Sequence, residues 1–199
     1  MPHEPAVKAL EHHLQSLFDI EDHKTVIVIN NGSSAIHALV SGFELQMKKK
    51  IRCATQSFTF PASAQGSCVG AVIVDIDAAG GLDLSLIDPS TVDVIIVTNC
   101  FGHLVNLDRY EEWCATYGKL LIFDNAATSV SNFASVHIPS SASSALPRNS
   151  LNFGTGATIS FHHTKPAGFG EGGAIIVDKK YESSIRQVNT TQRNETRLD

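Results

Sequence analysis

Apolar residues recur along this chain in two alternating patterns, one spaced as in a helix and one in short unbroken runs. Helical spacing predicts helices over residues 7–18, 35–45 and 107–117, and a run of small residues predicts another over 61–69. The unbroken runs, each the length of a strand, cover residues 25–29, 51–55, 72–76, 92–97, 119–123, 158–161 and 174–177. Strands that are apolar throughout are typical of a parallel sheet buried on both faces. The pattern therefore predicts an α/β fold of three layers, with a mostly parallel sheet between helices.

Two segments interrupt this alternation. Residues 129–149 are rich in Ser, Ala and Pro, and we expect an irregular excursion there rather than a linker between domains. Residues 189–199 are polar and carry neither a helix-stop signal nor a closing strand. A chain of 199 residues has the size of one large domain, so we expect a single domain over residues 1–199.

Composition and charge narrow the class of protein. With 43% hydrophobic and 18% charged residues, the chain has the content of an ordinary globular core. A formal net charge of −5 gives no electrostatic reason to expect nucleic acid or an anionic membrane as a partner. The first residues lack a signal-peptide pattern, and no apolar stretch is long enough to cross a bilayer. The four cysteines form no C-x-x-C pair, so we expect reduced, buried thiols in a cytoplasmic protein.

A glycine–serine turn follows the first predicted strand. Asn31, Gly32, Ser33 and Ser34 lie between that strand and a predicted helix, where free backbone N–H groups and hydroxyls make a good phosphate receptor. A plain turn with a serine as helix N-cap explains the same residues, and for this segment alone it is the commoner case. Neither a G-x-G-x-x-G fingerprint nor a P-loop is present.

Asp124 ends the apolar run 119–123, at the strand end where α/β proteins place their ligands. A partly buried carboxylate is costly unless it meets a cation or a strong donor, such as a protonated pyridine nitrogen or Mg²⁺. The missing P-loop lysine argues against a magnesium nucleotide site. A helix-capping aspartate explains this segment equally well.

Lys165 lies in a glycine-rich loop between two apolar runs. Burial lowers the pKa of an amine, and a lysine that forms a Schiff base has to be nucleophilic near neutral pH. An exposed loop lysine is the alternative, but the strand on each side disfavours it. The neighbouring His162 and His163 suggest a metal site. We expect none, because no third ligand follows at a recognised spacing and adjacent strand residues point to opposite faces.

These segments, in this order, resemble the DegT/DnrJ/EryC1/StrS family of pyridoxal-phosphate-dependent nucleotide-sugar aminotransferases, and the resemblance covers nearly the whole chain. The specific match is the run Ser160-Phe-His-His-Thr-Lys165, followed by Glu171-Gly172-Gly173. The Asn31-Gly32-Ser33 turn is similar to the family's turn but is not specific by itself. The resemblance implies the large domain of the fold-type-I pyridoxal-phosphate enzymes.

The resemblance also implies roles for individual residues. Lys165 would hold the cofactor as a Schiff base and act as general base, and Asp124 would pair with the pyridine nitrogen. Phe60, in the segment Ser57-Phe58-Thr59-Phe60, would stack on the ring. The phosphate would contact Gly32, Ser33 and Ser160. At the cofactor-binding position where the family commonly has a glutamine, this chain has Ala127, so a contact to the ring oxygen is lost or supplied by Thr128.

By the same resemblance, the reaction moves an amino group, with glutamate as the expected donor, to a nucleotide-linked keto-sugar, and the protein is a homodimer. The chain ends at Asp199, before the family's C-terminal small domain, so the activity of a chain of this length is left open. The polar run 189–194 suits a phosphate or a sugar nucleotide, and a frayed terminus is its alternative. Two other functions stay open: a deoxysugar dehydratase, in which a histidine replaces the lysine, and a non-catalytic fragment that binds cofactor or dimerises.

Overall fold

The computed structural model describes residues 4–128, 149–168 and 170–195. The helices are α1 (Glu4–Leu17), α2 (Gly32–Met47), α3 (Leu107–Tyr117) and α4 (Glu182–Glu195). The strands are β1 (Lys24–Ile29), β2 (Cys53–Gln56), β3 (Val72–Val74), β4 (Val94–Thr98), β5 (Leu120–Asp124), β6 (Gly156–Ser160) and β7 (Gly173–Asp178). Each predicted strand is present, with its ends shifted by at most two residues.

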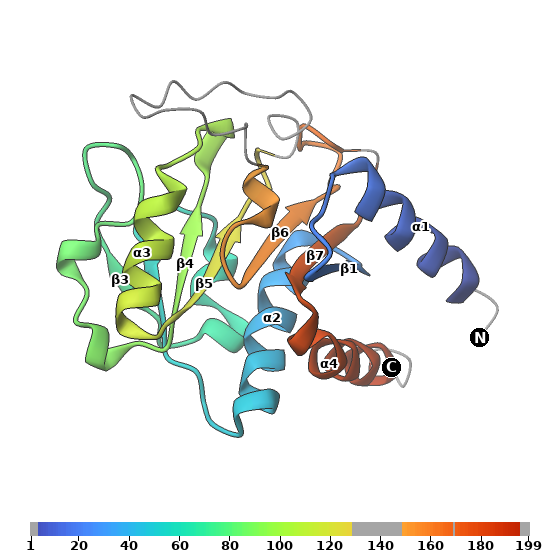
Figure 1. Ribbon diagram of the computed structural model, residues 1–199, viewed down its shortest axis with the longest axis horizontal. Coiled ribbons are helices and arrows are strands. Elements are labelled where there is room, and N and C mark those ends of the chain that lie inside the picture. The colour runs from blue at the N-terminus through green and yellow to red at the C-terminus, as the bar shows by residue number, and fades with distance from the viewer. Residues whose placement is uncertain (1–3, 129–148, 169, 196–199) are drawn as a thin grey trace.

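All seven strands form one sheet in the order β1-β7-β6-β5-β4-β2-β3 (Figure 1). The pairs β2–β3, β2–β4, β4–β5 and β5–β6 are parallel. Strand β7 runs against both of its neighbours, β1 and β6. The prediction of a mostly parallel sheet is confirmed, with β7 as its reversed strand.

Helices cover both faces of the sheet, which gives the predicted three layers (Figure 1). On one face, apolar side chains of α1 and α3 pack against alternate residues of the strands, such as Ile95 and Phe123. On the other face, α2 and Ile185 of α4 pack against the residues in between, such as Ile96 and Ile122. Strands β4 and β6 are buried throughout, which explains why the sequence shows unbroken apolar runs there.

Three local predictions need correction. The segment 61–69 forms two short 3₁₀ turns, Pro61–Ala64 and Gly66–Cys68, because Gly66 has a positive φ of 54° that an α-helix does not allow. Helix α2 begins at Gly32 instead of residue 35, and Asn31 rather than a serine caps it by accepting from the Ser34 N–H. The polar run 189–194 lies within α4, which continues to Glu195. Most of the predicted irregular segment, residues 129–148, lies outside the described residues.

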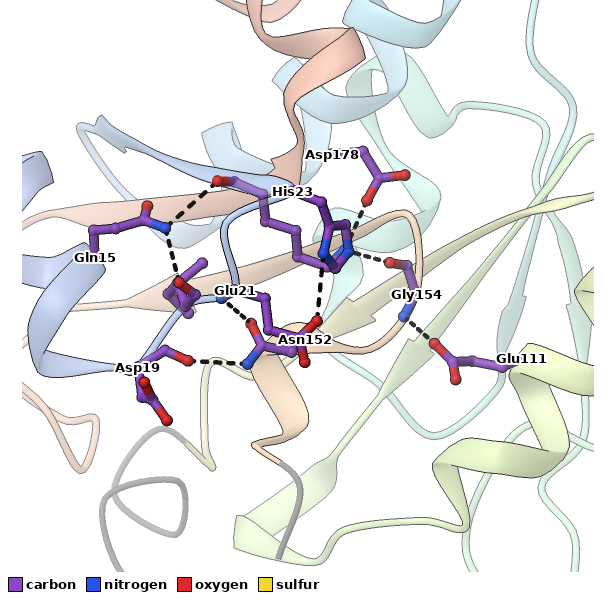
Figure 2. Close-up of polar contacts among 10 residues, drawn as sticks. Gln15, Asp19, Glu21, His23, Glu111, Asn152, Gly154 and Asp178 are labelled. Carbon is purple, nitrogen blue, oxygen red and sulfur yellow. Dashed lines mark hydrogen bonds and ion pairs between the residues drawn. The ribbon is translucent and has the colours of Figure 1, made fainter. Parts of the chain in front are cut away.

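A network of polar contacts fixes the edge of the sheet where β1 begins. The Asn152 side chain accepts from the Glu21 N–H and donates to the Asp19 carbonyl, as Figure 2 shows. Close by, the Nζ of Lys24, a residue only 1% exposed, donates to the Gly154 carbonyl at 2.6 Å and to Asp178 Oδ1 at 2.9 Å. A buried lysine at the start of a strand was not predicted, and here its charge is compensated by these acceptors.

Candidate active site

The predicted site residues gather at the edge of the sheet where the parallel strands end. Asp124 is the last residue of β5 and pairs in register with Thr158 of β6. Ser160, the last residue of β6, pairs with Gly173, which also pairs with Ile29 at the end of β1. The sheet thus brings together segments that are far apart in the sequence.

Asp124 is buried, and only 4% of its surface is exposed. Its Oδ1 accepts from the Ala126 N–H and from the Thr158 hydroxyl, both at 3.1 Å. Burial raises the pKa of the Asp124 carboxyl, although these donors and the charge of Lys165 act in the opposite direction. Among the described residues both bonds end on Oδ1, so Oδ2 is available to another donor.

Lys165 is held in a tight loop between β6 and β7. Its N–H donates to the His162 carbonyl, and its own carbonyl accepts from the Gly168 N–H, each at 2.8 Å. A side chain at Gly168 would lie 2.3 Å from the His162 carbonyl oxygen, so this turn requires glycine. The half-buried Lys165 side chain places Nζ 5.9 Å from the centre of the Phe60 ring.

The start of α2 lies directly against the end of β6. A Cβ added to Gly32 would be 2.9 Å from the Cβ of Ser160, closer than real side chains pack. Asn31 satisfies the Ser34 N–H at 2.8 Å, whereas the N–H groups of Gly32 and Ser33 lie in the first turn, which has no intrahelical acceptors. Gly32, Ser33 and Ser160 therefore form one small polar corner.

Two phenylalanines of the segment after β2 have different surroundings. Phe60 is 61% exposed and faces Lys165, as described above. Phe58 instead packs near the ring of Phe101, with 5.9 Å between the ring centres. Of the two, Phe60 is therefore the one placed beside the predicted lysine.

Ala127 lies in the turn after β5 and is half-buried. The Thr128 hydroxyl, considered above as a replacement for the missing glutamine, donates to Asn125, whose Oδ1 is 2.9 Å away. Asn125 Oδ1 also accepts from Asn99 Nδ2 at 2.8 Å. Thr128 is thus occupied in a buried amide network that the sequence did not indicate.

Strand geometry led us to expect that the two adjacent histidines point to opposite faces, but they do not. Strand β6 ends at Ser160, and the rings of His162 and His163 lie side by side, tilted by 39° with their centres 4.1 Å apart. Glu171 completes a group of three possible ligands whose atoms lie within 4.8 Å of one another. The spacing argument missed this group because the loop, rather than a helix, brings Glu171 back to His162.

The architecture defines an α/β domain with a lysine, a buried carboxylate and a small polar corner at one edge of its sheet. The sequence pattern of the DegT/DnrJ/EryC1/StrS aminotransferase family matches residues 3–194, and the chain belongs to that family. None of the helices within the described residues has the length and apolar character that a bilayer span requires.

Solved structures share the fold. PseC of Helicobacter pylori, an aminotransferase of pseudoaminic acid biosynthesis, matches with a TM-score of 0.72 and 20% identity over 90% of this chain. A DegT DnrJ EryC1 StrS aminotransferase from Brucella abortus and a putative PLP-dependent aminotransferase from Bacillus cereus each match with a TM-score of 0.68 and 23% identity over 92% of this chain. The chain covers 46%, 49% and 49% of those three proteins. The fold expected from the sequence, that of the fold-type-I aminotransferases, is confirmed.

Proposed function

We propose that this chain is the cofactor-binding large domain of a pyridoxal-phosphate-dependent aminotransferase that acts on nucleotide-linked keto-sugars. The observation that carries the proposal is that the buried Asp124 and the loop of Lys165 follow neighbouring strands at the same edge of the sheet. Burial raises the pKa of Asp124, and the charge of Lys165 is near enough to act in the opposite direction. Family membership supports the reaction type. The sugar substrate and glutamate as donor are inferred from the family resemblance.

The residues present fit pyridoxal phosphate. A buried carboxylate with a raised pKa is best satisfied by a cationic donor, which the protonated ring nitrogen of the cofactor supplies. The polar corner of Gly32, Ser33 and Ser160 combines a helix N-terminus with two hydroxyls, which suits a phosphate group. An exposed aromatic ring, Phe60, lies beside the lysine that would carry the cofactor.

Each residue then has a defined task. When bound, pyridoxal phosphate supplies an aldehyde and an electron-accepting ring. Lys165 would hold the aldehyde carbon through Nζ and, once displaced by the donor's amine, use the same Nζ to take the proton from the donor's α-carbon. Asp124 would keep the proton on the ring nitrogen, and Phe60 would cover one face of the ring.

The other two functions give different expectations. A dehydratase of this family would have a histidine at the position of Lys165, so the lysine disfavours that reaction. A non-catalytic fragment would bind the cofactor without turnover. Because this chain covers less than half of several related structures, the test has to separate binding from chemistry.

The first measurement is an absorbance scan after pyridoxal phosphate is added, followed by borohydride reduction and peptide mass mapping. We expect the cofactor mass on Lys165, and we expect Lys165→Ala to lose the visible band while it keeps its circular dichroism. Lys180→Ala, whose side chain is 65% exposed, is the matched control and should behave as wild type. Cofactor attached to another lysine would refute the assignment.

The second measurement is a half-reaction with glutamate. Transfer of the amino group to the cofactor should bleach the visible band and release one 2-oxoglutarate per bound cofactor. Cofactor on Lys165 with no 2-oxoglutarate would identify the chain as a non-catalytic fragment. Light scattering with and without the cofactor tests the proposed homodimer, and a monomer that retains tight binding would rule it out.

A further inference from the structure

We propose that His162, His163 and Glu171 form a binding site for a single divalent transition-metal ion of the Zn²⁺ class, on the loop that carries Lys165. These residues are the one group of this kind among the described residues. The site uses none of the residues assigned above to the cofactor, so it goes beyond the proposed function and is tested independently of it.

The loop itself brings the three side chains together. The Phe161 N–H donates to the Gly172 carbonyl at 2.9 Å, and the His163 N–H donates to the Gly170 carbonyl at 2.8 Å. Gly170 and Gly172 have φ angles of 136° and 153°, so the returning backbone bends in a way that favours glycine. Glu171 lies between these two glycines and is thereby brought back to the histidines eight and nine residues before it.

The distances suit tetrahedral coordination. His162 Nε2 and Glu171 Oε1 are 3.4 Å apart. Zn²⁺ binds histidine nitrogen and carboxylate oxygen at about 2.0–2.2 Å, which separates two tetrahedral ligands by roughly 3.4 Å. His163 supplies a third ligand atom within 4.8 Å of the others, and its exposed side chain can rotate to close that gap. Two imidazoles and one carboxylate leave a fourth position for water.

A neighbouring hydroxyl orients the first ligand. His162 Nδ1 lies 2.7 Å from Thr164 Oγ1 and accepts from the Thr164 N–H at 3.3 Å, so Nε2 is the nitrogen directed at Glu171. A metal-binding histidine usually donates its second ring N–H to an acceptor, so metal binding at Nε2 would place the proton on Nδ1, with the Thr164 hydroxyl as its acceptor. Without a metal, His162 and Glu171 form a partly exposed polar contact, with side chains 36% and 68% exposed, which contributes little to stability.

Isothermal titration of untagged, chelator-treated protein with ZnCl₂, and absorbance titration with CoCl₂, test the site. We expect one ion per chain and the intense visible bands of tetrahedral Co²⁺. His163→Gln and Glu171→Gln should each weaken Zn²⁺ binding at least about tenfold, and Thr164→Val by about tenfold, while circular dichroism is unchanged. Both substituted ligand side chains are exposed, so the variants should fold.

The chain offers a matched control in His12 and His13, a second pair of adjacent, exposed histidines, on α1. The double variant His12→Gln/His13→Gln should bind Zn²⁺ as wild type does. The proposal is overturned if wild type binds no ion, if the loop variants bind as tightly as wild type, or if the α1 variant loses binding to the same extent.

Discussion

The Thr158 hydroxyl donates to Asp124 Oδ1 at 3.1 Å, and both side chains are buried on the neighbouring strands β6 and β5. This hydrogen bond opposes the effect of burial, which raises the pKa of the Asp124 carboxyl. Thr158 is therefore placed to keep that carboxylate ionised and in a fixed orientation toward the ring nitrogen of the proposed cofactor.

Replacing Thr158 with valine removes this bond at nearly constant volume. Because a hydrogen bond to a charged group contributes about 1.5–3 kcal/mol, cofactor affinity should fall about tenfold or more. The pKa of Asp124 should rise further. As the pH is lowered, the variant should therefore lose cofactor binding at a higher pH than wild type does. Titrations with pyridoxal phosphate across a pH series measure both effects. Thr158→Ser keeps the hydroxyl and should restore the wild-type profile; if it does not, Thr158 acts through packing.

The two phenylalanines after β2 allow a paired test. Phe60 lies beside Lys165, whereas Phe58 lies near Phe101. A stacked aromatic ring contributes about 0.5–1.5 kcal/mol, so Phe60→Ala should weaken cofactor binding by about twofold to tenfold. Phe58→Ala should leave it unchanged. Equal losses in both variants would assign the effect to the segment as a whole.

Contacts at the opposite edge of the sheet, where β1 begins, allow a test of stability that does not affect the site. Lys24→Met leaves the Gly154 carbonyl and Asp178 without their buried cation, and we expect a loss of about 3 kcal/mol in the free energy of unfolding. Lys180→Met removes a second cation, 3.8 Å from Asp178 but exposed, and should cost less than about 1 kcal/mol. Urea unfolding measures both. A similar small loss in both variants would show that the buried ammonium has no special role.

Much of the fold could be predicted because the spacing of apolar residues and the helix caps are visible in the sequence. Helix α3 matches the prediction at both ends, since Asn106 caps its start and Gly118, with φ of 63°, ends it. The prediction of a helix over residues 61–69 was wrong because the small residues there fit a helix, whereas the backbone conformation of Gly66 prevents one. Local spacing thus predicts an element well where its caps are also visible.

Residues of the site could be predicted only where they come directly after a predicted strand. Asp124 could be identified because it ends an apolar run, whereas Thr158 was missed because it lies inside one and looks like any other strand residue. The meeting of His162 with Glu171 depends on how the glycine loop closes, which spacing does not encode. Lys24 was missed because a lysine at a strand end is usually exposed, and its buried acceptors come from residues 130 or more positions away.

The buried Asp124 carboxyl should lower the stability of the cofactor-free protein as the pH rises. Burial raises the pKa of its carboxyl, so between the ordinary value of about 3.9 and the higher folded value the native state binds more protons than the unfolded state. The stability contributed by this group is therefore complete below the ordinary pKa and is lost as the pH rises through the folded pKa. As the pH rises through the folded pKa, the native protein has to ionise a buried carboxyl, and the cofactor's ring nitrogen would compensate that charge.

Asp124→Asn tests this trade-off, because asparagine keeps an oxygen that accepts from the Ala126 N–H and the Thr158 hydroxyl but carries no charge. Without cofactor, the variant should be more stable than wild type at pH 7, and the difference should shrink toward pH 4. Added pyridoxal phosphate should stabilise wild type and have little effect on the variant, since the variant offers no anion to the ring nitrogen. Urea midpoints at several pH values, with and without cofactor, measure all of these effects. If Asp124→Asn is instead less stable at pH 7 yet gains as much from the cofactor as wild type does, then the carboxylate is a structural cap and the ring nitrogen has another partner.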